Sequence, residues 1–378
     1  MIIWTDFNDL WWPPKEDEDS PPPPPIPRKS CIEIDFQKDR VDLMVVHRYL
    51  SERCLLKSDG NFLSSNMLVS REIMASGHPN AMSNFMSMIG DDARSIDPVA
   101  LNEQLHHGTP ILQNDENIVL AYKAGRDMLI FSTKRVIRMD VQGLSGKKIE
   151  WQSIPYRCIR AFSVESAGSW DLDAEVKLYC GTFWLDGPCS VIKQDLRKGK
   201  ADIIAIQSVL AAQVFGGQDG SPCLTYNSQG ESIVGGGAIS SFTSWATGDG
   251  VEINAPEVNE KLHQDPPLLQ PDESVEVCYK VGRDLLIVTT KRILVVDRQG
   301  LSGKKVEYIS YPLRYCDAFK VTSAGTIGFL QEAKVTIYMS IPGATDITQE
   351  LSKKGADIWS VQNVLAGKIM NITTRSDA

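Results

Sequence analysis

Two stretches of this chain are near copies of each other. Residues 122–168 and 279–325 align without a gap at a constant offset of 157 positions, and the segment Gly143–Lys148 recurs unchanged as Gly300–Lys305. Such self-similarity means that one folding unit is used at least twice. The fold of this unit therefore decides most of the fold of the 378-residue chain.

The repeated unit reads as a succession of short strands. Apolar segments of strand length are separated by residues that are typical of turns. Gly125 and Gly143 stand in two of these turns, where a positive φ is easiest for glycine. In the first copy the predicted strands cover residues 118–122, 128–131, 136–139, 148–154, 159–165, 175–180 and 190–193. About seven strands in antiparallel succession predict a mainly β unit.

An amphipathic helix follows the last strand of each copy. Asp202 can cap its N-terminus in the first copy, and Asp357 stands at the corresponding position in the second. The apolar side chains that share one face at helical spacing are Ile203, Ile206, Val209, Leu210 and Val214, and then Ile358, Val361, Val364 and Leu365. Packed over the open end of a bent sheet, such a helix buries its own apolar face and that of the sheet.

The same signature appears a third time near the N-terminus. Residues 41–50 align with residues 201–210 and 356–365. Residues 31–36 alternate as a final strand should, and residues 1–4 fit the tail of a preceding strand. One hypothesis is that the chain starts inside a third unit, of which only the end is present. A distinct N-terminal helical extension is the alternative.

These patterns divide the chain into two complete units and their connections. The Pro-rich run from Pro21 to Pro27 should be extended, either as an insertion between two strands, which we favour, or as a docking segment for a reader of Pro-rich motifs. Gly- and Ser-rich sequence is typical of a flexible linker. The predicted parts are the end of a truncated unit with a Pro-rich insertion (1–56), a linker (57–87), the first unit (88–215), a Gly/Ser-rich linker (216–245), the second unit (246–370) and a tail (371–378).

Composition and charge narrow the class of protein. With 42% apolar and 23% charged residues the chain is globular, and a net charge of −9 argues against non-specific binding to nucleic acid. The eight cysteines form no CxxC pair and are expected to be reduced thiols of an intracellular protein. No apolar run approaches the roughly 18 residues that span a bilayer. We expect a location in the cytoplasm or an organelle interior, with peripheral contact to a membrane at most.

The sequence offers no sign of an enzyme. The pair His106-His107 is not repeated in the second copy, where His263-Gln264 stands, and neither an HExxH motif nor a nucleophile elbow is present. The segment Gly143–Lys148 lacks the first glycine of a phosphate-binding loop and ends in lysine instead of serine or threonine, so we interpret it as a hairpin loop. No catalytic residue, metal site or cofactor is therefore predicted.

One set of ordered motifs resembles a known family. The segments YKxGRD, TKR, QGLSGKK, SIPYR, FSVESAG and DLDAE of the first copy together resemble the bacterial pleckstrin-homology (PH) domain family. The resemblance covers about 88–215 well and about 246–370 less well, because DLDAE at 171–175 becomes GFLQE at 328–332. It implies a seven-stranded, partly open barrel that is capped by a C-terminal helix. It also implies a short helix before the first strand, around residues 101–105.

The resemblance also directs attention to the basic residues of two hairpin loops. PH domains of eukaryotes often bind phosphoinositide headgroups through basic residues on the first and third hairpin loops, at one end of the barrel. Converging positive charges beside a glycine backbone can hold a phosphate. The candidate anion- or lipid-binding residues are Lys123, Arg126, Lys147 and Lys148 in the first copy, and Lys280, Arg283, Lys304 and Lys305 in the second.

Lysines at hairpin tips are also common without any ligand, because solvent accepts them and they discourage edge pairing. Bacterial members that resemble this chain are not generally phosphoinositide binders, and many form ring-like oligomers. We therefore predict a non-catalytic binding or scaffold protein that acts through a protein partner or self-association. The alternative is a membrane-surface adaptor that binds anionic lipid through the basic hairpin loops.

Overall fold

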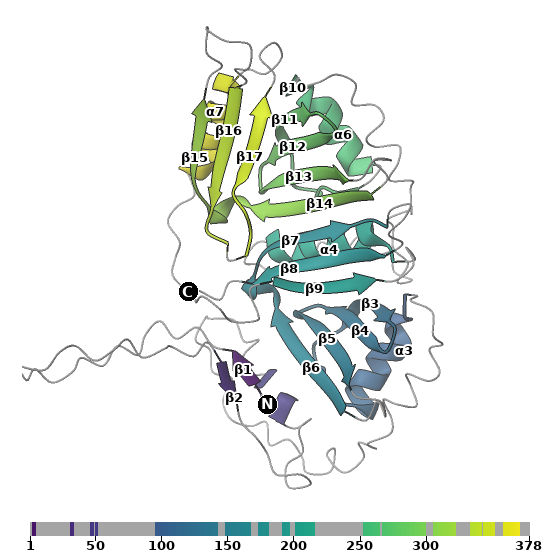
Figure 1. Cartoon of the computed structure of the whole chain (residues 1–378). Coiled ribbons are helices and arrows are strands. Elements are labelled where there is room, and N and C mark those ends of the chain that lie inside the picture. The colour runs from purple at the N-terminus through teal and green to yellow at the C-terminus, as the bar shows by residue number, and fades with distance from the viewer. Residues whose placement is uncertain are drawn as a thin grey trace, which may run out of the picture.

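A computed structural model gives the arrangement of the chain (Figure 1). The predicted linkers, the tail and the segment Pro21–Pro27 lie outside the residues that the structure describes. The described residues are 2–4, 31–33, 46–48, 50–51, 95–142, 148–167, 173–180, 191–196, 201–215, 252–264, 267–299, 305–322, 333–341, 343–351 and 358–370.

The first repeat, which we call unit 1, begins with a short helix and ends with a longer one. Seven strands lie between the two helices, as the sequence pattern predicts. The elements are α3 (Pro98–Glu103), a π-helical turn (Gln104–Gly108), β3 (Ile118–Ala124), β4 (Asp127–Ser132), β5 (Arg135–Gln142), β6 (Lys148–Pro155), a 3₁₀ turn (Tyr156–Cys158), β7 (Ile159–Glu165), β8 (Ala174–Cys180), β9 (Val191–Leu196) and α4 (Ile203–Phe215).

The second repeat, unit 2, has the same order of elements. Its one addition is a two-residue strand before the first helix, at the position where Ser95 of unit 1 forms an isolated bridge with Tyr122. The elements are β10 (Glu252–Ile253), α6 (Ala255–Gln264), β11 (Val275–Val281), β12 (Asp284–Thr289), β13 (Arg292–Gln299), β14 (Lys305–Pro312), a 3₁₀ turn (Leu313–Tyr315), β15 (Cys316–Thr322), β16 (Ala333–Met339), β17 (Ile347–Leu351) and α7 (Ile358–Ile369).

The N-terminal region repeats the end of a unit. Strands β1 (Ile2–Trp4) and β2 (Cys31–Glu33) pair antiparallel, and residues 46–48 and 50–51 are helical. Ile3 lies opposite Ile32, just as Leu178 of β8 lies opposite Ile192 of β9. The described N-terminal residues therefore follow the strand–strand–helix order with which both units end.

Glycine shapes the first hairpin of each unit, as expected for Gly125. Gly125 and Gly282 have φ values of 68° and 60°, a left-handed conformation that other residues adopt at a cost. The second residue after each glycine is an aspartate whose side chain ties the hairpin to the following strand. Asp127 accepts the backbone N–H of Val141 at 2.9 Å, and Asp284 accepts that of Arg298 at 2.9 Å. The same local chemistry thus fixes the same hairpin twice.

The sheets do not stop at the boundary between the units. Strand β14 of unit 2 pairs antiparallel with β7 of unit 1, so one eight-stranded sheet has the order β10-β11-β12-β13-β14-β7-β8-β9. The first four strands of unit 1 (β3-β4-β5-β6) and the last three of unit 2 (β15-β16-β17) form separate sheets. Figure 1 shows the consequence, since β7, β8 and β9 continue the strands of unit 2.

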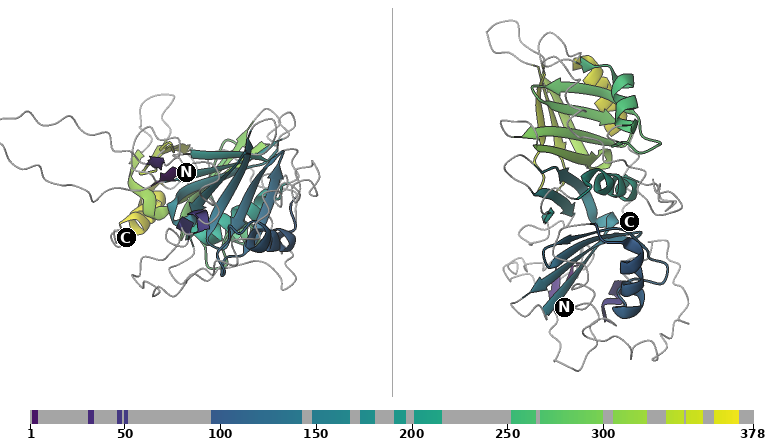
Figure 2. Two further views of the ribbon diagram at one scale, coloured as in Figure 1. Left: turned by 90° about the horizontal axis from the view of Figure 1, so that it is seen from below. Right: turned by 90° about the vertical axis from the view of Figure 1, so that its right-hand side faces the viewer.

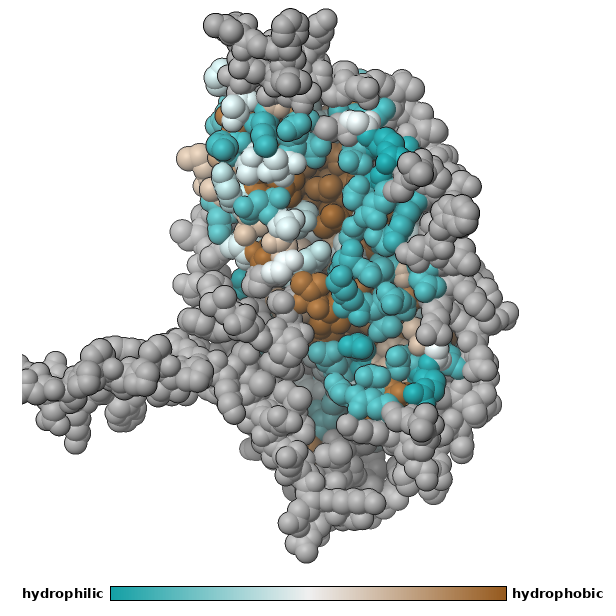
Figure 3. Space-filling view, in the orientation of Figure 1, coloured by the Kyte–Doolittle hydropathy of each residue, from teal (hydrophilic) through white to brown (hydrophobic). Residues whose placement is uncertain are grey.

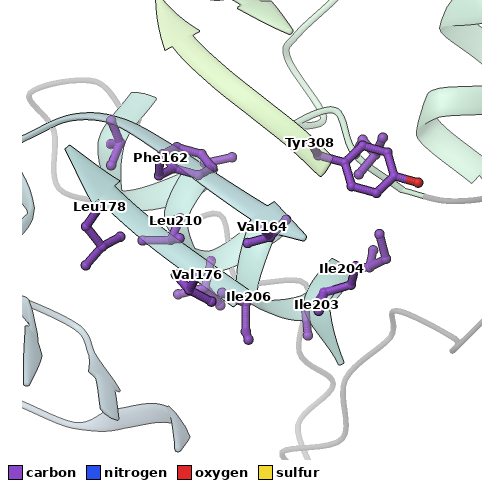
Figure 4. Packing of buried hydrophobic residues seen from close by; sticks show 14 of the residues in the cluster. Phe162, Val164, Val176, Leu178, Ile203, Ile204, Ile206, Leu210 and Tyr308 are labelled. Carbon is purple, nitrogen blue, oxygen red and sulfur yellow. The ribbon is translucent and has the colours of Figure 1, made fainter. Parts of the chain in front are cut away.

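The largest apolar core also crosses the boundary. Phe162, Val164 and Leu210 of unit 1 belong to the same buried cluster as Tyr308 of unit 2. Figure 4 shows the side chains of β7 and β8 directed toward α4, with Tyr308 entering this layer from β14. A second cluster fills the interior of unit 2 beneath α7, and a third lies between α3 and the first sheet of unit 1.

Helix α4 lies between the two units, on one side of the stack of sheets (Figure 2). Asp202 caps it as predicted, because its Oδ1 accepts the backbone N–H groups of Ile204 and Ala205 at 3.1 and 2.9 Å. Nearly every residue of the helix is buried. A helix that is apolar on all sides must have neighbours on all sides.

The fold class is the predicted one. Each unit is mainly β, with a bent and incompletely closed sheet that ends in a helix. Figure 3 shows a strip of apolar side chains down the middle of one face, bordered by polar ones, as expected of a partly open barrel. Within the part of the chain that the structure describes, no helix is both long enough and apolar enough to cross a membrane.

Candidate functional site

A buried arginine stands at the start of β5 in unit 1 and at the start of β13 in unit 2. In unit 1 the guanidinium of Arg135 donates to both carboxylate oxygens of Glu116, from Nε at 2.8 Å and from Nη2 at 2.9 Å. Neither side chain of this pair is exposed. Ser132 Oγ donates to Glu116, and Ile111 O and Ser153 Oγ each lie 2.9 Å from the Arg135 guanidinium. A bidentate pair of this kind fixes the orientation of the arginine.

Unit 2 contains the same arrangement and adds a contact from unit 1. Arg292 pairs with Glu273 at 2.9 Å from Nε and 3.1 Å from Nη2, and donates to Ser310 Oγ at 2.8 Å. Gln207 of helix α4 accepts from Arg292 at 3.4 Å and donates to the Leu268 carbonyl at 3.0 Å. The buried arginine of unit 2 is therefore part of the surface on which helix α4 of unit 1 docks.

The N-terminal helix docks on unit 1 in a comparable way. His47 aligns with Gln207, and its Nε2 lies 3.1 Å from Ser153 Oγ. Four residues further on, Ser51 accepts a hydrogen bond from Arg135 Nη1, and only 5% of its surface is exposed. Arg48 reaches Asn114 Oδ1 at 2.7 Å. Each buried arginine thus receives a helix from the preceding part of the chain.

Charged side chains accompany the strand pairing between the units. Glu307 of β14 accepts hydrogen bonds from Ser163 Oγ at 2.7 Å and Lys177 Nζ at 2.9 Å. Lys305 forms an ion pair with Glu165 at 2.6 Å. Burial by itself would lower the pKa of Lys177, but the hydrogen bonds that Lys177 donates to Glu307 and Glu175 outweigh this effect and raise that pKa, so the lysine stays charged.

These contacts define two kinds of surface. We call one kind of surface the acceptor face. It consists of the edge of β6 or β14, together with the buried arginine and the serine to which this arginine donates. In unit 2 these are β14, Arg292 and Ser310. We call the edge of the fifth strand, together with the outward side of the last helix, the donor face; in unit 1 it consists of β7 and α4. The donor face of unit 1 is bound to the acceptor face of unit 2.

The donor face of unit 2 has no such neighbour among the described residues. Strand β15 is an edge strand that pairs with β16 alone. Phe319 is half-buried, whereas the equivalent Phe162 of β7 is fully buried. The contrast is larger on the helix, since Trp359 of α7 is 70% exposed and the equivalent Ile204 of α4 is 4% exposed.

The acceptor face of unit 1 is half occupied among the described residues. The N-terminal helix contacts Arg135 and Ser153, but β6 is an edge strand that pairs with β5 alone. Trp151 of β6 is half-buried, whereas the equivalent Tyr308 of β14 is fully buried. Both ends of the tandem therefore keep an open strand edge.

The structure separates the predicted basic residues of the first hairpin loops. Arg126 and Arg283 are exposed at the tips of the β3–β4 and β11–β12 hairpins. Lys123 lies within β3, not in the loop, and has only 4% of its surface exposed. Lys280 is half-buried within β11. The two arginines are thus the residues of this group that reach solvent.

The third hairpin loop gives a different result. Lys147 and Lys304 lie outside the described residues, and Lys148 is the first residue of β6. Lys305 pairs with Glu165 across the boundary between the units, so its charge supports the joined sheet. Anion binding by these residues stays a prediction.

The buried arginines are the functional residues that the sequence reasoning missed. The TKR segment falls between the predicted strands 128–131 and 136–139, yet its arginine belongs to a strand and lies in the core. A signal was available, because Glu116 and Arg135 both recur at the offset of 157, as Glu273 and Arg292. A carboxylate and an arginine that repeat together are typical of a buried pair.

The described residues contain no group of three or more side chains suited to hold a metal ion. Cys278 and Cys316 are buried, free thiols. Burial raises the pKa of the Cys278 thiol to about 12, which makes it a poor nucleophile. His106 and His107 stand side by side, but His106 contacts the Glu116 carbonyl at 2.9 Å.

The strand order, the terminal helix and the repeated faces define a tandem of PH-like units. The family model described as bacterial PH domain matches residues 85–214 and 245–369, together more than half of the chain. The chain therefore belongs to the bacterial PH domain family, a class that is generally non-catalytic.

Relatives cover one unit at a time. The uncharacterized protein YjqA of Bacillus subtilis is 40% identical over 129 residues, which are 34% of this chain and 96% of that protein. A DUF1696 family protein with a PH domain from Shewanella loihica is 38% identical over 33% of this chain and 99% of its own, with a TM-score of 0.28. A PH domain from Shewanella amazonensis is 37% identical over 35% and 99%, with a TM-score of 0.27.

Docking of the N-terminal helix should weaken in acid. Burial, and then the positive charge of Arg135, lower the pKa of His47 from 6.5 to about 4, while Glu116 acts in the opposite direction. Nδ1 of His47 is buried and has no hydrogen-bond partner among the described residues, so a proton there would be unsatisfied. Because the docked pKa is lowered, the contribution is complete above about pH 6.5 and is lost as the pH falls toward 4.

Hydrogen exchange of residues 46–51, corrected for the intrinsic effect of pH, would measure this loss. The matched control is His47→Gln, because glutamine stands at the equivalent position of α4 as Gln207. The same acid sensitivity in that variant would show that His47 is not the titrating group.

Proposed function

We propose that this protein is a non-catalytic scaffold that joins PH units, and that its partner is a second copy of the chain. The donor face of unit 2 would bind the acceptor face of unit 1 in the next copy. The observation that carries the proposal is the β14–β7 pairing, in which one chain already joins two of its units in this way. A contact between unlike surfaces produces rings or rows of copies.

The intrachain pairing supplies the register for the proposed contact. Within the chain, Ile309 lies opposite Ser163 and Ser310 lies opposite Phe162. Applying the offset of 157 to both strands would place Gln152 of one copy opposite Lys320 of the next, and Ser153 opposite Phe319. An exposed strand edge is a ready template for such pairing.

Charge complementarity supports the same register. Glu150 takes the position of Glu307, which within the chain accepts a hydrogen bond from Ser163. Lys320 takes the position of Ser163, and both Glu150 and Lys320 are exposed. The proposed contact would therefore bring the acidic Glu150 of one copy close to the basic Lys320 of the next. The two residues lie at opposite ends of the tandem.

The terminal helix supports the choice of a PH unit as partner. Trp359 of α7 and Met370, which directly follows this helix, are 70% and 78% exposed, at the positions where α4 buries Ile204 and Phe215. Within the chain, the Phe215 ring packs 5.0 Å from the guanidinium of Arg292. Large apolar side chains that are exposed on one side of a helix are typical of a binding site.

A charge exchange tests the proposal directly. Lys320→Glu should lower self-association at least about tenfold, because it sets two carboxylates against each other at the contact. Adding Glu150→Lys to the same chain should restore it. Sedimentation velocity over a series of concentrations would measure the association, with the exposed Lys193→Glu on β9 as the matched control.

Two results would contradict the proposal. One is association of the wild-type chain that Lys320→Glu leaves unchanged. The other is that the wild-type chain and a variant with a loosened N-terminal helix both remain monomeric at every concentration. Binding to anionic vesicles that is lost in Arg126→Glu or Arg283→Glu would instead favour the membrane-adaptor alternative, since these are the exposed cations of the first hairpins.

A further inference from the structure

The acceptor face of unit 1 already carries a helix from its own chain. His47 contacts Ser153 at 3.1 Å, and Ser51 is hydrogen-bonded to Arg135. In unit 2, Gln207 of helix α4 accepts a hydrogen bond from the guanidinium of Arg292, which also donates to Ser310 Oγ, the equivalent of Ser153. Both helices therefore contact the buried arginine of the unit that they dock on.

Three helices of this chain can be compared at the two aligned positions that make these contacts. Position 7 of the aligned segments is His47, Gln207 or Gln362, and the position four residues later is Ser51, Ala211 or Ala366. The first two helices are bound to a unit: Gln207 and Ala211 of α4 are completely buried, Ser51 is 5% exposed, and His47 is half-buried with its Nδ1 fully covered. Gln362 and Ala366 of α7 are half-buried.

Helix α7 therefore has side chains like those of the docked helix α4 at these positions, but its side chains are less buried. Its position 7 is glutamine, as in α4, and a glutamine both accepts from the arginine and donates to the Leu268 carbonyl in unit 2. In unit 1 the carbonyl equivalent to Leu268 is that of Ile111, which Arg135 contacts at 2.9 Å. The acceptor face of unit 1 thus offers Gln362 the same partners that Gln207 uses.

One acceptor face can hold one helix. Arg135 is fully buried and its Nη1 already donates to both Ser51 and Ser153, so a second helix cannot approach this nitrogen while the N-terminal helix is in place. The N-terminal segment contributes weaker contacts than α4 does: among the described residues, the strand edge of β6 beside it stays unpaired, whereas α4 is accompanied by the β7–β14 pairing.

We propose that the N-terminal helix is a displaceable cap on the acceptor face of unit 1, and that helix α7 of a second copy competes with it for Arg135 and Ser153. This inference rests on the proposed function, because it names the regulation of the same contact. While the cap is bound, the chain offers its donor face but not its acceptor face. Releasing the cap converts the chain into one that can associate at both ends.

The double variant His47→Ala/Ser51→Ala in the full chain tests the cap. Both substitutions remove contacts of the cap and leave Arg135, Ser153 and the β6 edge unchanged. We expect faster hydrogen exchange of residues 46–51 and self-association that is stronger by at least about tenfold, since hydrogen bonds to a charged group are lost. His47→Gln, which keeps a side chain that α4 uses at this position, should behave like the wild type.

The possible results separate the cap from the proposed function. If exchange becomes faster but association does not increase, the cap does not control the contact and the inference is overturned. If wild type and double variant associate equally and both lose association in Lys320→Glu, the cap fails while the proposed function stands. If neither chain associates at any concentration, both fail. Unchanged thermal unfolding of the units would show that the substitutions act at the cap alone.

Discussion

Replacing Glu273 with glutamine should lower the free energy of unfolding by about 3–5 kcal/mol. Glu273 and Arg292 are both fully buried, and the carboxylate accepts two hydrogen bonds from the guanidinium, at 2.9 and 3.1 Å. It also accepts from Thr289 Oγ at 2.7 Å and from the Gln270 amide at 3.0 Å. The substitution leaves the charge of Arg292 without its counterion in the core.

The control for this prediction is the neighbouring residue. Asp272 pairs with Lys291 at 2.5 Å, but its side chain is 73% exposed, so Asp272→Asn should change the stability by less than about 1 kcal/mol. Chemical denaturation of the two variants would measure the difference. Equal losses would show that the buried pair contributes no more than a surface ion pair.

The second large effect is expected at the junction of the units. Tyr308→Ala should lower the free energy of unfolding by about 3–5 kcal/mol, because it empties a fully buried position in the core that both units share. Tyr308 lies opposite Val164 of unit 1 in the joined sheet. The loss should therefore uncouple the units as well as destabilise unit 2, and denaturation followed by a probe in each unit should detect two transitions.

The equivalent residue of unit 1 provides the comparison. Trp151 occupies the same position of β6, but it is only half-buried because no strand from another unit covers that edge among the described residues. Trp151→Ala should lower the free energy of unfolding by about 1–2 kcal/mol. This loss is smaller than that of Tyr308→Ala, although tryptophan is the larger side chain. A loss as large as that of Tyr308→Ala would mean that the burial of Tyr308 owes little to the junction.

Several parts of the fold follow from local sequence chemistry. The turn at Gly125 and the cap at Asp202 were both predicted, since a positive φ and an orphan N–H group make demands that a few residue types meet. The short helix before the first strand was predicted from the family resemblance and is present as α3 and α6.

The candidate site could be predicted much less well. Phe162 and Phe319 are the same residue at equivalent positions of the two copies, so the repeat predicts the same burial for both. Phe162 is fully buried and Phe319 is half-buried, because β14 covers the edge of β7 while β15 is an edge strand among the described residues. Burial at these positions depends on a neighbouring unit, about which the local sequence carries no information.

The sequence by itself determined the repeated unit: its strands, its hairpins and its terminal helix, because these depend on the spacing of apolar residues and on the chemistry of turns and caps. The tertiary structure alone decided that the units share one sheet, that Gln207 reaches Arg292, and that His47 and Ser51 dock on unit 1. The two copies present equivalent strand edges, and the position of each edge in the folded chain decides whether another unit of the chain covers it, because an edge is covered only by a strand that lies beside it.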